Sequence, residues 1–277
     1  MAEINYDNNG ILAGVAFRGD KELVKLLLDR GVNVNNPGYK LGISLAAAVD
    51  GGHKSVAELL LDRGADVNME WDPDVNIHWG CYGSVLGVAA ARGDVKLVGL
   101  LLHKGADIEA SNGRIGNPLC AAACQEHQEV VELLLDQGID VNIKGGDYGC
   151  PLGAAAALGR TPIIELLLDR GADVNINGGI HGSPLGSAKA GLYHYSRAYT
   201  MAILLDRGAQ PLEGERVEVR REELPGGEIK VHYVLHEPAL GQITSFFTKD
   251  GALMREGRER RNIEDERSPS PSQVSGS

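Results

Sequence analysis

Long stretches of the chain repeat one arrangement of apolar and polar positions. A short, alanine-rich apolar run, such as residues 152–157, is followed by a longer leucine-rich run, such as residues 163–168, and then by a polar, glycine-rich stretch. The decapeptide LLLDRGADVN occurs at residues 59–68 and again at residues 166–175. The leucine-rich runs predict helices whose apolar stripe is wider than one packing surface can cover. Each helix therefore needs neighbours on both flanks.

The glycine that ends each leucine-rich run marks the period of this pattern. Regular self-similarity of this kind is typical of a repeat array, in which each unit buries its apolar face only against its neighbours. The sequence therefore predicts a stack of repeats. The glycines are Gly31, Gly64, Gly105, Gly138, Gly171 and Gly208, and their successive intervals are 33, 41, 33, 33 and 37 residues.

Glycine, proline and capping residues divide each repeat into two helices and a loop. In residues 150–182, Pro151 suits the first position of a short helix, and Gly159 supplies the left-handed residue that ends it. Thr161 is expected to cap the second helix and Gly171 to close it. In the other repeats, the expected first caps are Ser84, Asn117 and Ser183, and the expected bends are Gly19, Gly52 and Gly93.

The tetrads NPLC at residues 117–120, CPLG at 150–153 and SPLG at 183–186, together with the LLLDRGADVN runs, resemble the ankyrin repeat family. In that family a short helix, a longer antiparallel helix and a β-hairpin finger recur with a period of about 33 residues. The resemblance implies an all-α ankyrin repeat solenoid at residues 10–212, after an N-terminal extension at residues 1–9. Its six repeats are expected at residues 10–42, 43–83, 84–116, 117–149, 150–182 and 183–212.

Two departures from the family pattern refine this resemblance. The family's first helix opens with T-P-L-H, whereas cysteine or glycine stands here in the histidine position. We therefore expect the hydrogen bonds of the usual Thr/His pair, which tie a finger to the next helix, to be lost. The finger glycines Gly116, Gly149 and Gly182 stand directly before the caps. This variant resembles repeats common in fungal ankyrin proteins, including the sensor arms of NLR-like defence proteins.

The resemblance also implies where a partner binds. Ankyrin stacks bind partners on a concave face, which the exposed ends of the first helices and the finger tips line. Counting in register places Phe17, Arg18, Asp50, Arg92, Cys124, Gln125 and Leu158 on the helical part of this face. It places Tyr39, Lys40, Arg114, Asp147, Tyr148 and His181 on the finger tips.

The interval of 41 residues contains an insertion with both tryptophans of the chain, MEWDPDVNIHWGCYG at residues 69–83. Long loops on a rigid scaffold are where binding residues concentrate, and Trp and Tyr are frequent at binding hot spots. Trp71, Trp79 and Tyr82 are therefore candidate partner contacts. Alternatively, the two tryptophans fold back on the neighbouring fingers as a local plug.

Composition and charge argue against several other classes of protein. A formal charge of −11 disfavours a nucleic-acid surface, which needs clustered lysine and arginine. No apolar run approaches the length needed to cross a bilayer, and the four cysteines fit no disulfide framework. We therefore expect a soluble, intracellular monomer in the cytoplasm, the nucleus or both, with no membrane partner.

Motifs for catalysis or metal binding are not evident. Cys120, Cys124 and His127 have a spacing that could present three zinc ligands, but Cys120 stands at an ordinary first-helix position and His127 at a bend. A structural role is therefore expected for all three. The sequence has no P-loop, GxSxG, HExxH or GxGxxG pattern, and no enzyme activity, cofactor or metal is expected.

The periodicity stops after residue 212. Residues 217–238 alternate apolar and charged positions on both sides of Pro225, Gly226 and Gly227, which predicts a β-hairpin. We place this hairpin segment at residues 213–248 and expect it to cap the last repeat. Residues 249–277 are polar, of mixed charge and of low complexity, which predicts a disordered tail.

These observations favour a non-catalytic interaction scaffold or adaptor with a regulatory role. Such a protein would bind another protein in the concave ankyrin groove, for example as a transcription coregulator. The alternative is a recognition module of a fungal NLR-like defence or incompatibility system.

Overall fold

A computed structural model of the chain divides into two compact units, Met1–Gln210 and Pro211–Ser277. The residues that it describes are 9–36, 43–69, 81–191, 194–211, 215–223, 229–237, 241–247 and 253–258.

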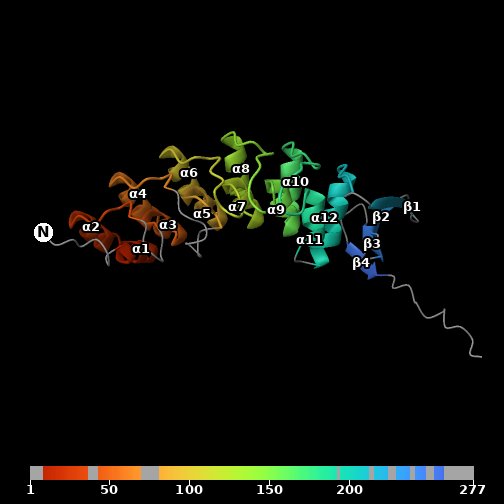
Figure 1. Cartoon of the computed structure of the whole chain (residues 1–277), viewed down its shortest axis with the longest axis horizontal. Coiled ribbons are helices and arrows are strands. Elements are labelled where there is room, and N and C mark those ends of the chain that lie inside the picture. The colour runs from red at the N-terminus through yellow and green to blue at the C-terminus, as the bar shows by residue number, and fades with distance from the viewer. Residues whose placement is uncertain are drawn as a thin grey trace, which may run out of the picture. The chain divides into compact units, whose positions relative to one another are not determined.

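The first unit is a stack of helix pairs, as the periodicity predicts. The first helices of the pairs are α1 (Asn9–Arg18), α3 (Ser44–Asp50), α5 (Val85–Arg92), α7 (Pro118–Cys124), α9 (Pro151–Ala157) and α11 (Pro184–Ala190). The second helices are α2 (Lys21–Asp29), α4 (Lys54–Asp62), α6 (Val95–His103), α8 (Gln128–Asp136), α10 (Thr161–Asp169) and α12 (His194–Asp206). Each first helix contacts the next one along the chain, and Figure 1 shows the first helices α1 to α11 in one row beside the second helices.

The core of the stack lies between the two rows of helices. The first helices from α3 to α9 are buried almost completely, because their alanines let neighbouring helices approach closely; Ala46, Ala47 and Ala48 of α3 have no exposed surface. The second helices bury one stripe of larger side chains, such as Val56 and Leu60 of α4. This division follows from the two kinds of apolar run in the sequence.

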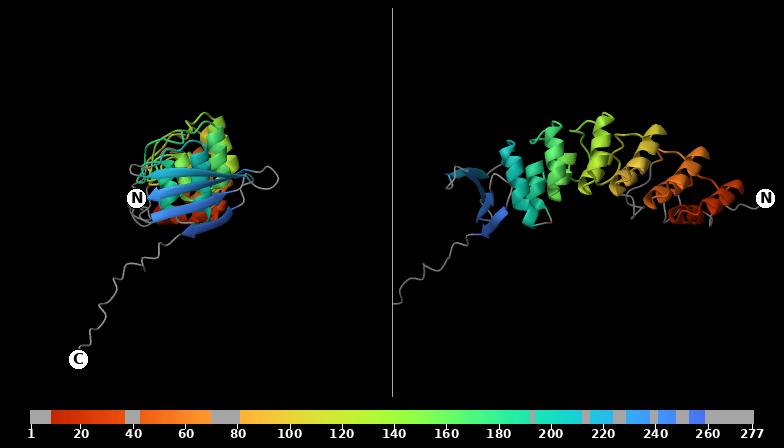
Figure 2. Two further views of the ribbon diagram at one scale, coloured as in Figure 1. Left: turned by 90° about the vertical axis from the view of Figure 1, so that its right-hand side faces the viewer. Right: turned by 180° about the vertical axis from the view of Figure 1, so that it is seen from behind.

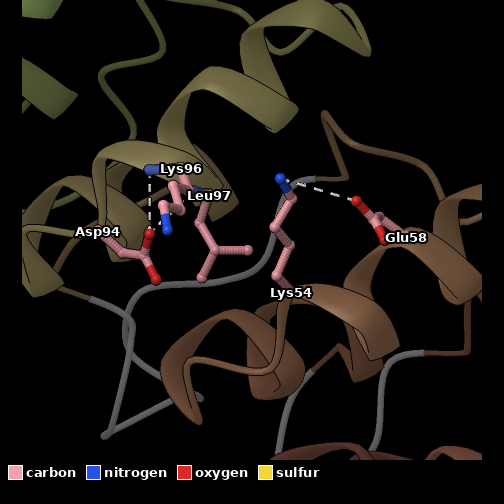
Figure 3. Close-up of polar contacts among 5 residues, drawn as sticks. All are labelled: Lys54, Glu58, Asp94, Lys96 and Leu97. Carbon is pink, nitrogen blue, oxygen red and sulfur yellow. Dashed lines mark hydrogen bonds and ion pairs between the residues drawn. The ribbon is translucent and has the colours of Figure 1, made fainter.

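Side-chain caps begin four of the described first helices, and three of these caps, Ser84, Asn117 and Ser183, are where the sequence predicts them. The caps are Ser84, Asn117, Cys150 and Ser183, and each accepts a hydrogen bond from the backbone N–H three residues later, at 3.0, 2.9, 3.2 and 3.1 Å. Asp94 caps the second helix α6 by accepting from the N–H groups of Lys96 and Leu97, both at 3.0 Å. Figure 3 shows this cap at the start of α6 and, separately, the ion pair between Lys54 and Glu58 on α4.

The predicted cap at Thr161 is wrong. Thr161 is the first residue of α10, and the residue before it, Arg160, is the N-cap and makes no side-chain cap bond. The Arg160 carbonyl already accepts from the N–H groups of Ile163 and Ile164, at 3.0 and 2.9 Å. The N-cap is therefore Arg160, directly after the bend glycine Gly159, and the helix begins one residue earlier than expected.

A first set of ties joins neighbouring repeats at the bends between their helices. A side chain from each of four repeats reaches a backbone carbonyl at the end of the preceding first helix. The ring Nε2 of His53 lies 3.0 Å from the Phe17 carbonyl, and that of His127 lies 2.9 Å from the Ala91 carbonyl. Arg92 donates to the Asp50 carbonyl in the same way, and Arg160 donates to the Cys124 carbonyl at 2.9 Å.

The His127 ring explains why the third bend needs glycine. Gly93 has φ of +74°, and a Cβ atom there would lie 2.4 Å from Nδ1 of His127. Glycine therefore permits both the left-handed turn and the close packing of the ring from the next repeat. His127 has the structural role that its position in the sequence predicts.

A second set of ties joins the roots of successive fingers. The side chain of Asn68 donates to the Gly105 carbonyl at 2.9 Å and accepts from the Asp107 N–H at 2.8 Å. Asn35, Asn142 and Asn175 make the same two bonds to the repeat that follows each of them. Exposed ion pairs run beside these bonds, between an aspartate that ends a second helix and a basic residue of the next repeat: Asp29–Arg63, Asp62–Lys104, Asp136–Arg170 and Asp169–Arg207.

The fingers themselves are tied by backbone contacts. The Ile115 N–H donates to the Cys81 carbonyl at 2.8 Å, and the Asp147 N–H donates to the Arg114 carbonyl at 2.6 Å. The Ile180 N–H donates to the Asp147 carbonyl at 2.8 Å. Adjacent finger backbones touch, so that a Cβ atom at Gly146 would lie 2.3 Å from the Ile115 carbonyl carbon. The fingers are thus held without the Thr/His pair that the tetrads lack.

The second unit contains a four-stranded antiparallel sheet of order β1-β2-β3-β4. Its strands are β1 (Arg216–Glu223), β2 (Ile229–Glu237), β3 (Gly241–Phe247) and β4 (Leu253–Arg258), which Figure 2 shows side by side. The predicted hairpin is present, and Arg216 pairs with His236 at one end of it. The prediction of two strands followed by disorder from residue 249 is corrected at β3 and β4. The sequence of β4 has few apolar residues, and its register comes from pairing with β3.

Candidate protein-binding surface

The finger face of the stack consists of the bend ends of the first helices and the adjoining fingers. Several residues predicted to contact a partner meet near its middle, although they come from four different repeats. We name Tyr82, Arg114, Gln125, Asp147, Tyr148 and Leu158 the central patch. These residues lie at the ends of α7 and α9 and on three successive fingers.

Tyr82 and Gln125 join the second finger to the end of α7. Tyr82 is half-buried, and its hydroxyl forms a hydrogen bond with the side chain of Gln125. Burial raises the pKa of the Tyr82 hydroxyl, and this hydrogen bond opposes the rise. The hydroxyl therefore stays neutral at physiological pH and can both donate and accept a hydrogen bond.

Arg114 and Asp147 form an ion pair between the third and fourth fingers. The Arg114 Nη2 and Nε atoms lie 3.1 and 3.3 Å from Asp147 Oδ2. The Arg114 side chain keeps 73% of its surface exposed, so most of its guanidinium faces solvent. A guanidinium with free N–H groups and an adjacent carboxylate offer both signs of charge to a partner.

Tyr148 and Leu158 form the apolar part of the central patch. Both are partly buried and pack against a cluster of Cys120, Cys124 and Ala154. Burial raises the pKa of the Cys124 thiol to about 12, and it raises the pKa values of the Cys120 and Cys150 thiols as well. These thiols are therefore protonated at neutral pH and act as small core side chains.

Arg160 and Glu126 border the central patch, although neither is among the predicted contact residues. The Arg160 Nη1 lies 3.1 Å from Glu126 Oε2, while its Nε donates to the Cys124 carbonyl. A signal was available, because Arg160 stands at the bend position that His53 and His127 occupy in two other repeats. Alignment of the bends would have found it.

The other predicted contact residues lie away from the central patch or have a further role. Phe17 and Arg18 are exposed at the end of α1, and Phe17 keeps 44% of its surface exposed. His181 is partly exposed on the finger after α10. Arg92 is exposed but also ties two repeats together through the Asp50 carbonyl. Tyr39, Lys40, Trp71 and Trp79 lie outside the described residues.

The described residues contain no group of three or more His, Cys, Asp and Glu side chains that could hold a metal ion. Cys120 is fully buried in α7, and the ring of His127 contacts the Ala91 carbonyl. Within the same residues, every helix is too short or too polar to cross a membrane.

Comparison with known proteins finds ankyrin repeats in the same region of the chain that forms the stacked helix pairs. A family model described as "Ankyrin repeats (3 copies)" matches residues 86–178, and one described as "Ankyrin repeat" matches residues 44–71. The crystal structure of the human ASB11 ankyrin repeat domain is similar, with a TM-score of 0.56 and 27% sequence identity. That match covers 72% of this chain and 84% of the human one. No curated protein matches the sequence.

The fold is widespread, since 554 solved chains match it, so the fold alone does not identify a partner. Ankyrin repeats are generally protein-binding modules and are typically non-catalytic. The family models, the similar human structure and the stacked helix pairs together show that the chain contains a stack of ankyrin repeats.

Proposed function

We propose that the chain is a non-catalytic regulatory adaptor that binds a partner protein on its finger face, with the central patch as the main contact. The observation that carries this proposal is that four repeats contribute Tyr82, Arg114, Gln125, Tyr148 and Leu158 to one surface. Tyrosine and arginine are enriched among residues that dominate binding energy. The finger sequences add the expectation of a fungal type of ankyrin protein.

The central patch is suited to binding because it is already ordered. Backbone hydrogen bonds between fingers hold Cys81 to Ile115 and Arg114 to Asp147. The tyrosine rings rest against neighbouring repeats, and only part of each is exposed. A partner therefore meets side chains whose conformational entropy is largely lost on folding, which lowers the cost of association.

Affinity capture followed by mass spectrometry tests this proposal with two matched arginine variants. Arg114→Ala removes an ion pair between repeats on the finger face, where Arg114 and Asp147 lie 3.1 Å apart. Arg170→Ala removes an equivalent pair at the ends of the second helices, where Arg170 and Asp136 lie 3.0 Å apart. We expect Arg114→Ala to reduce capture of the same partner at least tenfold and Arg170→Ala to leave it unchanged.

A third variant separates binding from stability. Gln125 is exposed at the end of α7, so Gln125→Lys adds a charge to the central patch without emptying core volume. It should weaken capture while the melting temperature stays near that of the unmodified chain. Equal capture by all three variants, with all three folded, would refute the central patch as the contact.

A further inference from the structure

The first repeat leaves exposed a face that every later repeat buries. Leu23 and Leu27 of α2 are only partly buried, whereas their counterparts Val56 and Leu60 in α4 have no exposed surface. Ile11 of α1 is 46% exposed. The residues in register with Ile11 in the later repeats are all buried: Ser44, Val85, Pro118, Pro151 and Pro184.

The direction of this exposed face follows from the contacts of the first repeat. Helices α1 and α2 already contact α3 and α4 of the second repeat. The surface that stays exposed on Ile11, Leu23, Leu26 and Leu27 therefore corresponds to the surface that a preceding repeat covers elsewhere in the stack. We name these four residues the end face. Leu26 is 49% exposed, whereas its counterpart Leu59 is partly buried.

Polar groups beside the end face match the ties of the other junctions. Arg30 is in register with Arg63 and Arg170, each of which pairs with an aspartate of the preceding repeat. The Gly31 carbonyl and Asn33 N–H are in register with the Gly64 carbonyl and Asp66 N–H, which bind the side chain of Asn35. Among the described residues, none forms the corresponding bonds to Arg30, Gly31 or Asn33.

We propose that the end face is a docking surface for one further ankyrin repeat. Its second helix would end in an aspartate that pairs with Arg30, and its finger root would carry an asparagine that binds Gly31 and Asn33. Its apolar helix faces would cover Ile11, Leu23 and Leu27. The docked repeat is thus defined by continuity with the interface that already joins the other repeats of this chain.

A second copy of this chain is a poorer occupant of the same surface. Two end faces that met about a twofold axis would bring both Arg30 side chains to one interface, with no aspartate at the position that Asp29 occupies for Arg63. The end face also differs from the central patch in location, so this proposal is independent of the binding function proposed above.

A chain with one added repeat tests the docking surface. The probe is one copy of residues 150–182 placed directly before Gly10 of the full chain, in place of residues 1–9. Its copy of Asp169 then stands 34 positions before Arg30, the spacing that separates Asp136 from Arg170 in the native pair. Tethering supplies the repeat at an effective concentration of about millimolar or more, so that a weak contact is also detected.

Docking of the added repeat should raise the melting temperature by about 5 °C. It should also slow hydrogen exchange of the α2 amides. Arg30→Ala and Ile11→Asp should each remove part of this gain in the extended chain, and each should change the melting temperature of the original chain by less than about 1 °C. Asn33→Ala is the control, because it keeps the backbone N–H that the added asparagine binds.

An unchanged melting temperature together with unchanged α2 exchange in the extended chain would overturn the proposal. So would equal effects of Ile11→Asp in the extended and original chains, because the end face would then stay exposed in both. Neither result depends on capture of a partner through the central patch.

Discussion

The junction between the third and fourth repeats differs from the other described junctions at the finger roots and the ends of the second helices. At the junction before it, Asn68 bonds to Gly105 and Asp107, and Asp62 pairs with Lys104. At the third junction, between the third and fourth repeats, Glu109 stands in the position of the asparagine. His103 replaces the aspartate of the ion pair, and Gln137 replaces its basic partner. Among the described residues no side-chain bond replaces either tie there.

On its finger face the same junction keeps the bend and backbone ties and adds an ion pair. Arg114 and Asp147 form an ion pair, the Asp147 N–H donates to the Arg114 carbonyl, and His127 reaches the Ala91 carbonyl. All three contacts join the third repeat to the fourth, and Arg114 and Asp147 belong to the central patch. The comparison teaches that the proposed binding residues also hold the stack together where the ties at the finger roots are missing.

The largest expected effect compares the finger with the end of the second helix in the fourth repeat. Alanine substitution of one glycine on each side should give different losses of unfolding free energy. Gly146 and Gly138 both have positive φ, of +67° and +92°, so alanine is strained at either position. A Cβ atom at Gly146 would also meet the backbone of Ile115, whereas one at Gly138 meets nothing within 4 Å. Denaturant unfolding should give a loss of about 1–2 kcal/mol for Gly138→Ala and about 3 kcal/mol or more for Gly146→Ala. Equal losses would mean that the fingers do not touch.

The pH dependence of stability measures whether the Cys124 thiol is buried beneath the finger face. The pKa of this thiol is about 12 in the folded chain, compared with about 8.5 for an unfolded cysteine. A raised folded pKa favours the protonated thiol, so its contribution to stability is intact below about pH 8.5 and is lost as the pH rises toward 12. Between pH 8 and pH 10 the original chain should lose about 2 kcal/mol more unfolding free energy than Cys124→Ala.

The control for this measurement is Cys81→Ala, because Cys81 is only partly buried. Burial raises the pKa of the Cys81 thiol as well, but no value as high as that of Cys124 is expected for a half-exposed group. The pH profile of Cys81→Ala should therefore stay close to that of the original chain. Parallel profiles for all three chains would show that Cys124 is accessible to water.

Restoration of the missing asparagine should strengthen the third junction. Glu109→Asn places an amide in register with Asn35 and Asn142, which bond to the glycine 29 residues later in the next repeat, as Gly138 stands to residue 109. We expect a gain of about 1 kcal/mol in unfolding free energy, and a loss of about 2 kcal/mol for Asn68→Ala, which removes two existing hydrogen bonds. Chemical denaturation of both variants measures the two changes, and a destabilised Glu109→Asn would contradict the register.

The smallest effect is expected from the missing ion pair. His103→Asp combined with Gln137→Arg recreates the pattern of Asp136 and Arg170, whose side chains are 66% and 39% exposed. Exposed pairs of this kind contribute about 0.2–1 kcal/mol, and salt screens them. A double-mutant cycle in low and high salt should show a small coupling that decreases with salt, and a coupling insensitive to salt would argue against an ion pair.

Sequence reasoning was reliable where the determining interactions are local. The caps at Ser84, Asn117 and Ser183 were predicted because a short polar side chain before a helix bonds to that helix's own first turn. The cap at Thr161 was misplaced by one residue, because the helix starts one residue closer to the bend glycine than the capping pattern indicates. β4 was missed because its pairing with β3 contributes more than its own composition.

The candidate site was predicted only in part, because several of its contacts join different repeats rather than neighbouring residues of one repeat. Register counting placed Arg114, Gln125 and Tyr148 on one face, because that face follows from the repeat. It did not reveal that Tyr82 bonds to Gln125 or that Arg114 pairs with Asp147, since both contacts join different repeats. Arg160 was overlooked because its contact to the Cys124 carbonyl also crosses a junction.

The sequence by itself determined the period, the helix pairs and the small first-helix side chains, because periodicity, caps and glycine act within a single repeat. Only the tertiary structure decided which ties hold each junction, where tyrosine and arginine side chains meet, and which face of the first repeat remains exposed. These depend on side chains about one repeat apart in the chain. Their distances are set by stacking, and each repeat becomes ordered only against its neighbours.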